Sequence, residues 1–390
     1  MGFWSNTCRV LHREGRRILA RRSYLALLTL LPAVAFTIFG SLFLRPVTDL
    51  PIAVLDNDNT PTSRKLAMMI DATEGVRLFC DITETSAGEQ LIRQGVVYAM
   101  FIIPEGFERA LLGGEGAIVS FFNSGVNMTT AGVLERDVQS AVRTFAVGAQ
   151  LQLFESRGLA PEEAMAIAMP VRFDRHVLFN PGLDYAAYLA PSFMVMTLLI
   201  FAVMATIYAI GSELKDGTTR EWLTTAGGSM WSALIGKLTL PTVAMWLWSG
   251  VMFYTLFVLL GVPMRGNFGV LALATAVFVA SYEAVAVVFV ALFDNMRLAL
   301  SVGGGYSVLS FSFSGVTFPA MAMYAPVRLA GNLFPFTFYM KIYVDLAVRG
   351  VPMGYVMKDL AAILLFLIVP LLVLPRLKDM CNDECYWGKS

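Results

Sequence analysis

Residues 185–212 read YAAYLAPSFMVMTLLIFAVMATIYAIGS, a run of 28 residues with no charged side chain. As a helix this run exceeds the ~30 Å hydrocarbon core of a bilayer, which about 20 apolar residues cross. Outward from it, five further runs are apolar, and Glu283 is their only charge. They are 24–44, 238–264, 266–293, 298–327 and the shorter 360–375. The sequence therefore predicts a polytopic α-helical membrane protein with six transmembrane helices.

Composition supports this fold class. The 390 residues are 57% hydrophobic and only 15% charged, with a mean hydropathy of +0.65, whereas soluble domains are about 25% charged. Lys plus Arg and Asp plus Glu number 29 each, so no bulk positive field attracts a polyanion and a nucleic-acid partner is not expected. Cys8, Cys381 and Cys385 are either ordinary thiols or a bridge or metal site on the cytoplasmic side.

Basic residues indicate orientation, because short cytoplasmic flanks are enriched in Lys and Arg. The flanks 1–23, 212–237, 294–297 and 376–390 hold six, three, one and three basic residues. The short segments on the other side hold four, or five with Lys358. Both termini are therefore predicted in the cytoplasm. A cleaved signal peptide is the alternative at the N-terminus, but the 21-residue apolar run is longer than the 7–15 residues of such a peptide.

Residues 45–184 differ from the rest of the chain, with 11 basic and 18 acidic residues. Strand-like and helix-like runs alternate here, which is typical of an α/β unit. The strand-like runs are 52–55, 76–80, 98–103 and 117–122, the helix-like runs are 63–72, 86–94 and 104–112, and a longer helical run covers 129–157. The sequence thus predicts an α/β extracytoplasmic domain between the first and second transmembrane helices. Residues 56–59, DNDN, lack the Gly and the distal Glu of a calcium loop, which favours a turn.

The first 23 residues have the spacing of an amphipathic helix. Apolar or small side chains recur every three or four residues, and arginines occupy another side. The apolar side is Trp4, Cys8, Leu11, Gly15 and Ile18, and the basic side is Arg9, Arg13 and Arg16. We expect this helix in the inner membrane interface with its basic side toward lipid phosphates. A solvated basic extension that only sets the topology is the alternative.

A polar segment, 212–237, follows the second predicted span. Its first half mixes both charge signs with an apolar tip, and Gly227 and Gly228 then mark a turn. The charged residues are Glu213, Lys215, Asp216, Arg220 and Glu221, and the tip is Trp222 and Leu223. A short helix of this kind suits docking into a groove of another protein. A plain cytoplasmic hairpin is the alternative.

Several local patterns, taken in order, resemble the permease subunit of type-2 ABC exporters, which share their transmembrane fold with the ABCG transporters. The resemblance covers nearly the whole chain. The patterns are LPIAVLDND at 50–58 with Ser63-Arg64, IPEGF at 103–107, Phe179-Asn180-Pro181, ELKDGT at 213–218, Gly236-Lys237-Leu238, Ser314-Gly315, Phe318-Pro319, Leu333-Phe334-Pro335 and Tyr339.

The resemblance implies two permease subunits, identical or related, that work with separate ABC ATPase subunits, where ATP and Mg would bind. This chain has no G-x-x-x-x-G-K-[ST] loop, since Gly236-Lys237 is followed by Leu238. The implied activity is export of amphipathic or lipid-like compounds across a bacterial inner membrane, so membrane lipid is a further partner. The external domain could also contact an envelope adaptor protein.

The same resemblance assigns roles along the chain. Residues 212–237 become the segment that couples to the ATPase. The run 298–327 is too long for one straight helix, and Gly303, Gly304, Gly305, Pro319 and Pro326 suggest breaks, so 318–343 is predicted as a broken or re-entrant segment on one membrane face. The resemblance places an outer gate there, with Pro319, Pro335 and Tyr339. The expected organisation is a cytoplasmic helix at 1–23, a first span at 24–44, the external domain at 45–184, five further spans within 185–375 and a cytoplasmic tail at 376–390.

Glu283 departs from the family pattern, because a carboxylate inside a span costs about 2.5–3.5 kcal/mol on insertion scales. It either contacts a cationic substrate or a proton, or it bonds to Ser281, Tyr282 or a neighbouring helix. Two other functions compete with export. A membrane anchor would use the external domain to bind an envelope partner, and a membrane-embedded enzyme would need more polar groups within the spans than Glu283.

Overall fold

A computed structural model describes residues 2–44, 47–169, 176, 178–180 and 184–388, so Pro181 and Lys389 of the sequence patterns lie outside the described residues. The chain divides into two compact units with separate hydrophobic cores. The first unit combines 1–44 with 179–390, and the second contains 45–178.

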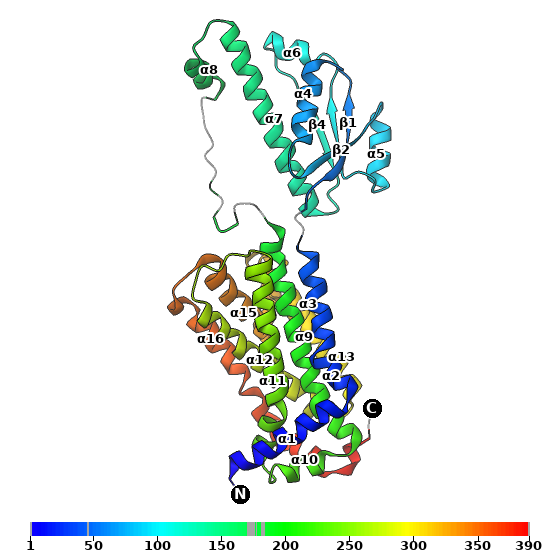
Figure 1. Cartoon of the computed structure of the whole chain (residues 1–390), viewed down its shortest axis with the longest axis vertical. Coiled ribbons are helices and arrows are strands. Elements are labelled where there is room, and N and C mark those ends of the chain that lie inside the picture. Colours follow the sequence, from blue (N-terminus) through cyan, green and yellow to red (C-terminus); the bar gives the residue numbers. More distant parts are fainter. Residues whose placement is uncertain (1, 45–46, 170–175, 177, 181–183, 389–390) are drawn as a thin grey trace. The chain divides into compact units, whose positions relative to one another are not determined.

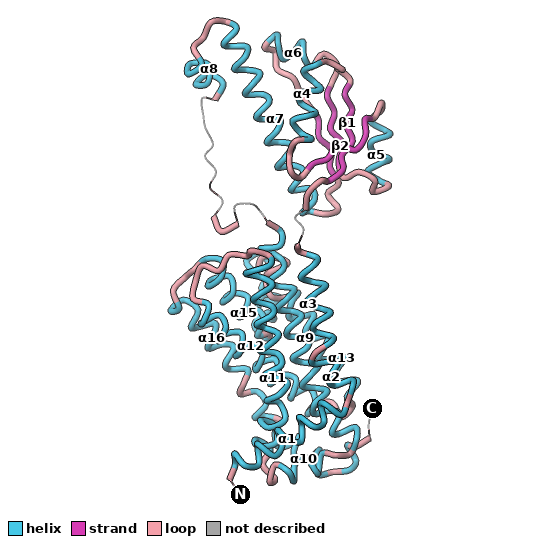
Figure 2. Tube along the Cα trace, in the orientation of Figure 1, coloured by secondary structure: helices cyan, strands magenta, loops and turns pink. Residues whose placement is uncertain are grey.

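The first unit is a bundle of helices, and its described residues contain no strand (Figures 1 and 2). Its longer helices are α1 (Phe3–Ala20), α2 (Arg22–Leu28), α3 (Leu30–Leu42), α9 (Tyr185–Asp216), α10 (Thr219–Thr225), α11 (Met230–Tyr254), α12 (Phe268–Leu292) and α13 (Met296–Ser312). They continue with α14 (Ala325–Ala330), α15 (Pro335–Tyr343), α16 (Met353–Phe366) and α17 (Leu374–Asn382). Short 3₁₀ or π segments are η1 (Thr255–Leu259), η2 (Ala320–Ala322), η3 (Gly331–Leu333), η4 (Val344–Arg349), η5 (Val369–Leu372) and η6 (Glu384–Tyr386).

Within the described residues, five helical stretches are long and apolar enough to cross a membrane. They are Arg22–Leu42, Ala186–Asp216, Met230–Leu259, Phe268–Leu292 and Met353–Asn382. Each coincides with one of the six predicted runs. The remaining run, 298–327, differs: α13 ends at Ser312 after 17 residues, or about 25 Å, and Gly315 takes a left-handed conformation with φ of +85°.

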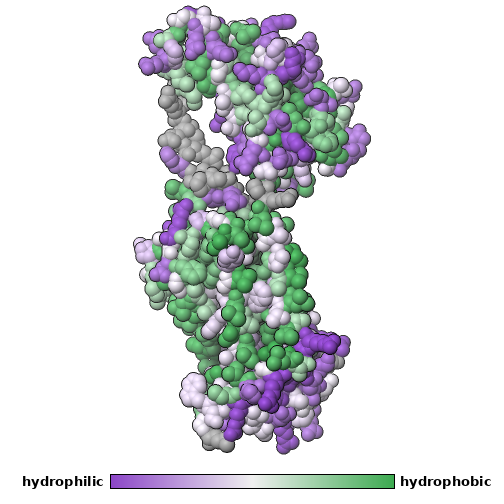
Figure 3. Space-filling model, viewed as in Figure 1, coloured by the Kyte–Doolittle hydropathy of each residue, from purple (hydrophilic) through white to green (hydrophobic). Residues whose placement is uncertain are grey.

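Helix α9 forms the centre of the bundle, because it contacts α2, α3, α11, α12 and α13. Its buried side chains are largely Ala, Val, Leu and Ile. The visible face of the unit is apolar over its middle, and hydrophilic residues gather at the end that carries α1 and α10 (Figure 3). We call this end the α1 end. A chain with this surface belongs in a bilayer, and the protein is a multi-pass membrane protein.

The second unit contains a four-stranded sheet, counted over its described residues, in the order β2-β1-β3-β4. Strand β1 runs parallel to β2 and β3, whereas β4 is antiparallel to β3. The strands are β1 (Leu50–Asp56), β2 (Val76–Asp81), β3 (Ala99–Ile103) and β4 (Ser120–Asn123). The helices are α4 (Pro61–Asp71), α5 (Thr85–Arg93), α6 (Phe107–Gly113), α7 (Met128–Ser156) and α8 (Pro161–Ala168). Each predicted strand run overlaps one of these strands, and the short helix α8 was not predicted.

The acidic run after β1 forms a turn, as its sequence predicted. Asp56 Oδ1 accepts hydrogen bonds from the backbone N–H of Asp58 and of Asn59, both at 3.0 Å. Thr60 then caps α4, because its hydroxyl accepts from the Ser63 N–H and its own N–H donates to the Ser63 hydroxyl. The carboxylates in this turn therefore bond to the chain itself.

Candidate functional site

Charged side chains from four helices meet inside the bundle at the α1 end, and we call them the ion cluster. Glu213 lies at its centre with none of its side chain exposed. Its carboxylate contacts Arg13 Nη1 at 2.6 Å, Arg17 Nη1 at 2.5 Å and Lys237 Nζ at 2.7 Å. Four cations and four carboxylates balance within the cluster: Arg13, Arg17, Arg21 and Lys237, with Glu14, Glu213, Asp216 and Glu221.

Helical spacing explains why these groups meet. Arg13, Arg17 and Arg21 follow one another at intervals of four, so α1 and its C-cap present them on one side. Glu213 and Asp216 are three residues apart in the last turn of α9 and face that side. Arg17 binds both carboxylates and also donates to the Ser212 hydroxyl at 3.0 Å. The last turn of α9 is thus held by a row of guanidinium groups.

Lys237 and Glu14 form the most deeply buried part of the cluster. Lys237 Nζ lies 2.5 Å from Glu14 Oε2, and the two side chains are 0% and 1% exposed. The ammonium also lies 5.2 Å from the centre of the Trp222 ring, within the range of a cation–π contact. Removing one partner of such a buried pair is costly, at about 3–5 kcal/mol, because the other charge stays buried without compensation.

The cluster also shifts the pKa of Arg13, which lies in α1, outside the helices that are long enough to cross a membrane. Burial lowers the pKa of the Arg13 guanidinium, but hydrogen bonds and charge attraction to Glu213 and Glu221 outweigh that effect and raise the pKa above its ordinary value. Two buried atoms, Glu14 Oε1 and Arg17 Nε, have no hydrogen-bond partner among the described residues. The arginine therefore stays charged, and the network is not fully satisfied in this arrangement.

The predicted coupling residues separate by burial. Glu213 and Trp222 are fully buried. The other four are exposed, and two of them, Asp216 and Glu221, bind arginines of α1 or its C-cap; the remaining two are Lys215 and Arg220. The prediction that Trp222 forms an exposed apolar tip is wrong. Gly227 and Gly228, both at positive φ, turn the chain so that α10 folds back on α11, and Trp222 Nε1 donates to the Ala233 carbonyl at 3.2 Å.

Helix α1 also packs differently from its prediction. Its buried side chains are Thr7, Val10, Glu14 and Ile18, and it packs against α11. Trp4, on the predicted apolar side, is 74% exposed. Arg13 faces carboxylates instead of lipid phosphates, because Glu213 and Glu221 lie beside it.

Sequence reasoning missed five members of the ion cluster as site residues: Arg13, Glu14, Arg17, Arg21 and Lys237. A signal was present, since Glu14 is the only acid among the six arginines of residues 1–23. Its spacing of four from Val10 and from Ile18 also places it on a helical face that could be buried.

Glu283 lies in α12 with 5% of the residue exposed. Its Oε2 accepts a hydrogen bond from Thr242 Oγ1 of α11 at 2.7 Å. The sequence left Ser281, Tyr282 and a neighbouring helix as possible structural partners of Glu283, and the structure shows a partner on the neighbouring helix. Ser281 instead donates to the Phe278 carbonyl, and the Tyr282 hydroxyl accepts from the Phe336 N–H.

The residues expected at an outer gate lie between α13 and α16, where the chain breaks into short helices. Pro335 and Tyr339 are buried in α15, and Pro319 is exposed. The Tyr339 hydroxyl lies 2.7 Å from Thr275 Oγ1 of α12, and its ring stacks on Phe278 with centroids 4.4 Å apart. Helix α15 is thus packed against α12, one of the helices long enough to cross a membrane.

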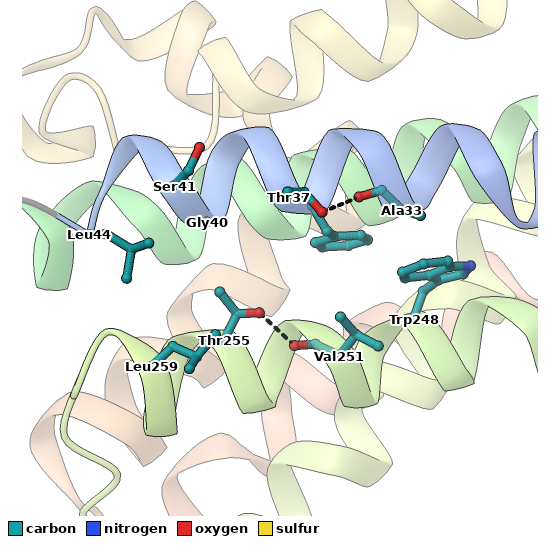
Figure 4. A pocket seen from close by; sticks show the side chains of 10 residues that line it. Ala33, Thr37, Gly40, Ser41, Leu44, Trp248, Val251, Thr255 and Leu259 are labelled. Carbon is teal, nitrogen blue, oxygen red and sulfur yellow. Dashed lines mark hydrogen bonds between the residues drawn. The ribbon is translucent and has the colours of Figure 1, made fainter.

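A groove of about 350 Å³ lies between α3 and α11, as Figure 4 shows. Thr37 and Thr255 line it, and each donates within its own helix, to the carbonyls of Ala33 and Val251. At its floor Phe36 stacks on Trp248 with centroids 5.7 Å apart. Since these hydroxyl hydrogens are already used, the groove offers an apolar surface and none of the charge seen in the ion cluster.

The described residues contain no group of three or more His, Cys, Asp and Glu side chains that could hold a metal ion. The chain matches the family model of the ABC-2 family transporter protein over residues 22–374. A comparison with curated proteins gave no match. The family match includes every helix of the ion cluster except α1. The chain therefore belongs to the ABC-2 family of transporter proteins and is a permease of the type-2 ABC class.

Proposed function

We propose that this permease is the membrane part of an ATP-driven exporter that moves amphipathic or lipid-like compounds outward. Two permease subunits, identical or related, would form the passage, and separate ABC ATPase subunits would bind ATP and Mg. Both termini would lie in the cytoplasm of a bacterium, and the second unit would lie outside its inner membrane. In this arrangement α13 with the short helices after it completes the sixth crossing.

The ion cluster is the observation that carries this proposal. It joins α1 to α9 and α11, which are long enough to cross the membrane, through buried charge pairs that resist separation. Helix α10 is attached to α1 through the exposed Glu221, which binds Arg13. It is attached to α11 through the buried Trp222, whose Nε1 donates to the Ala233 carbonyl. A displacement of α10 would therefore be passed to both spans. Residues 212–237 would still couple the permease to the ATPase, but the exposed and the buried residues would have different parts in it. Lys215, Arg220 and Glu221 would meet the ATPase, while Glu213 and Trp222 would fix their helices to the spans.

The first experiment tests whether an ATPase subunit binds at this exposed surface. The complex is purified in mild detergent from native membranes, and ATP hydrolysis is measured. We expect a nucleotide-binding subunit to copurify with the wild type and to be lost in a Lys215→Glu, Arg220→Glu double variant. Arg93→Glu is the control, because Arg93 is 80% exposed on the second unit. Loss of the ATPase from neither variant, or equal loss from both, would contradict this docking surface.

A second candidate function is a membrane anchor whose second unit binds an envelope partner. One observation favours it: a groove of about 610 Å³ lies among α4, α6 and α7, with Lys65, Phe145 and Gln152 in its lining. An anchor needs no ATPase, so absence of any nucleotide-binding subunit from the purified complex would favour this function over export. The division of the chain into a cytoplasmic helix, a first span, an external domain, five further spans and a cytoplasmic tail is part of the export proposal. Its limits are 1–23, 24–44, 45–184, 185–375 and 376–390.

A further inference from the structure

A groove of about 340 Å³ lies on the side of the bundle between α11, α12 and the segment that contains η5. Its lining is mainly apolar and includes two tryptophans, Trp231 and Trp246, which are 51% and 46% exposed. Glu283 is the only charged residue that lines it among the described part of the chain. The groove thus combines one acidic group with a large apolar surface on the side of the bundle.

The hydrogen bonding of Glu283 is incomplete. Its Oε1 is buried and has no hydrogen-bond partner among the described residues. Its Oε2 is paired with Thr242 Oγ1, but that hydroxyl also lies 2.8 Å from the Leu238 carbonyl. A hydroxyl has one hydrogen, so it cannot donate to both acceptors at once. An ionised Glu283 would therefore have one shared donor for two oxygens, at a depth where a bare carboxylate is costly.

Two states avoid a bare carboxylate at this site. A protonated Glu283 donates from Oε2 to Thr242 Oγ1 while Thr242 donates to the Leu238 carbonyl, and Oε1 then remains a neutral acceptor without a donor. Alternatively, a bound ammonium group donates its N–H to Oε1, and the carboxyl proton leaves to water. The groove carries no net charge in either state. The second state needs a ligand that brings a cation into an apolar environment.

Position along the helices shows how a ligand would enter. Thr242 follows Lys237 by five residues, or about 7.5 Å of helix, so the acid lies close to the ion cluster at the α1 end. Trp231 lies near the start of α11, where tryptophans favour the membrane interface. Aromatic faces also attract ammonium groups. An amphipathic cation in the membrane leaflet at the α1 end could reach Glu283 sideways from the lipid.

We propose that this groove binds a lipophilic ammonium ion, whose N–H donates to Glu283 Oε1 and whose tail lies along Trp231 and Trp246. The claim that such an ion binds here depends only on the groove and the carboxylate. The claim that such ions are the exported cargo rests on the proposed export function.

The test uses the full chain in nanodiscs of phosphatidylcholine, whose headgroup has no N–H donor. Binding of dodecylamine is compared with that of dodecanol, which has the same tail and no charge. We expect the wild type to favour the amine by tenfold or more, in line with about 1.5–3 kcal/mol for a charged hydrogen bond. Glu283→Gln keeps the size of the side chain and should remove this preference. Asp359→Asn is the matched control, because Asp359 is 6% exposed but does not line this groove.

A second variant protects the test against poor folding of Glu283→Gln. Ala280→Leu fills the groove and leaves the carboxyl group, so it should weaken binding of the amine and the alcohol alike. An unchanged amine preference in Glu283→Gln would overturn the proposal. Displacement of the amine by phosphatidylethanolamine, whose headgroup is itself an ammonium with N–H donors, would support the site and make a lipid its occupant.

The outcome is separable from that of the export proposal. Amine binding that depends on Glu283 in a chain with no ATPase partner would support the site and reject export. Conversely, an ATPase complex whose chain binds amine and alcohol equally would support export and reject the site.

Discussion

The ammonium group of Lys237 lies 2.7 Å from Oε1 of Glu213, and neither side chain is exposed. The two residues belong to α11 and α9, and Glu14 of α1 completes the contact on the other side of the ammonium. One lysine therefore joins three helices in a place where its charge cannot be compensated by water.

Replacing Lys237 should destabilise the bundle more than replacing any exposed lysine. Lys237→Met keeps the length of the side chain but leaves Glu14 and Glu213 with excess negative charge, so we expect the free energy of unfolding to fall by about 3–5 kcal/mol. The measurement is denaturation in mixed micelles with increasing SDS. Lys215→Met is the control, since Lys215 is exposed and should change stability by less than about 0.5 kcal/mol.

A double variant tests the mechanism behind that loss. Glu14→Gln combined with Lys237→Met removes one of the uncompensated carboxylates, so it should be more stable than Lys237→Met alone. If the two losses simply add, the contact between Glu14 and Lys237 is not what holds α1 to α11.

Arg17 should be needed as an arginine and not only as a cation. Its guanidinium contacts Glu213, Asp216 and Ser212 at once, and a lysine offers one point charge in place of this fork. In Arg17→Lys we expect backbone amides of α1 to exchange hydrogen about tenfold faster, as a loss of about 1.5 kcal/mol would produce. Mass spectrometry of peptides from residues 3–20 measures this. Arg16→Lys, at an exposed position on the same helix, should leave the exchange unchanged.

The sequence predicted the secondary structure of this protein better than it predicted the ion cluster. Spans such as 185–212 were predicted because uncharged runs of that length have few alternatives, and β1 because it is buried on both faces between two parallel neighbours. The break after Ser312 was indicated by Pro319 and Pro326, whereas the breaks suggested by Gly303, Gly304 and Gly305 are not found, because these residues lie inside α13. These signals are local, so a single chain contains them.

The ion cluster could not be predicted in the same way, because its partners are far apart in the chain. Arg13 and Glu213 are 200 residues apart, and nothing in either segment specifies the other. The exposed or buried state of Trp222 likewise depends on how sharply the chain turns at Gly227 and Gly228. Charge in 1–23 and 212–237 predicted that both flanks lie on one side of the membrane, but not that the two flanks bind each other.

Asp58 should make the second unit sensitive to acid. Burial raises the pKa of its carboxyl group, but hydrogen bonds from Thr60 Oγ1 and the Glu108 N–H outweigh this and hold the pKa below its ordinary value. Because the folded pKa lies below the unfolded one, of about 3.9, the stabilisation is complete above the unfolded pKa and is lost as pH falls through the folded pKa.

Hydrogen exchange of the sheet at pH 6 and pH 3 measures this effect. The wild type should lose more protection on acidification than Asp58→Asn, which cannot gain the proton. Glu115→Gln, at an exposed position, should behave like the wild type. Identical acid sensitivity of the wild type and Asp58→Asn would show that another carboxylate is responsible.

The contact between Tyr339 and Thr275 should stabilise the packing of α15 on α12. The two hydroxyl oxygens are buried and 2.7 Å apart, so Tyr339→Phe leaves Thr275 without its interhelical partner while the stacking on Phe278 is kept. We expect the free energy of unfolding in mixed micelles to fall by about 1 kcal/mol. Thr275 still donates to the Leu271 carbonyl, which limits the loss. Thr275→Val should cost a similar amount, and the double variant should cost little more than either, because both changes remove the same hydrogen bond. Fully additive losses would mean that each hydroxyl acts through another neighbour, and that α15 is held to α12 by its apolar contacts alone.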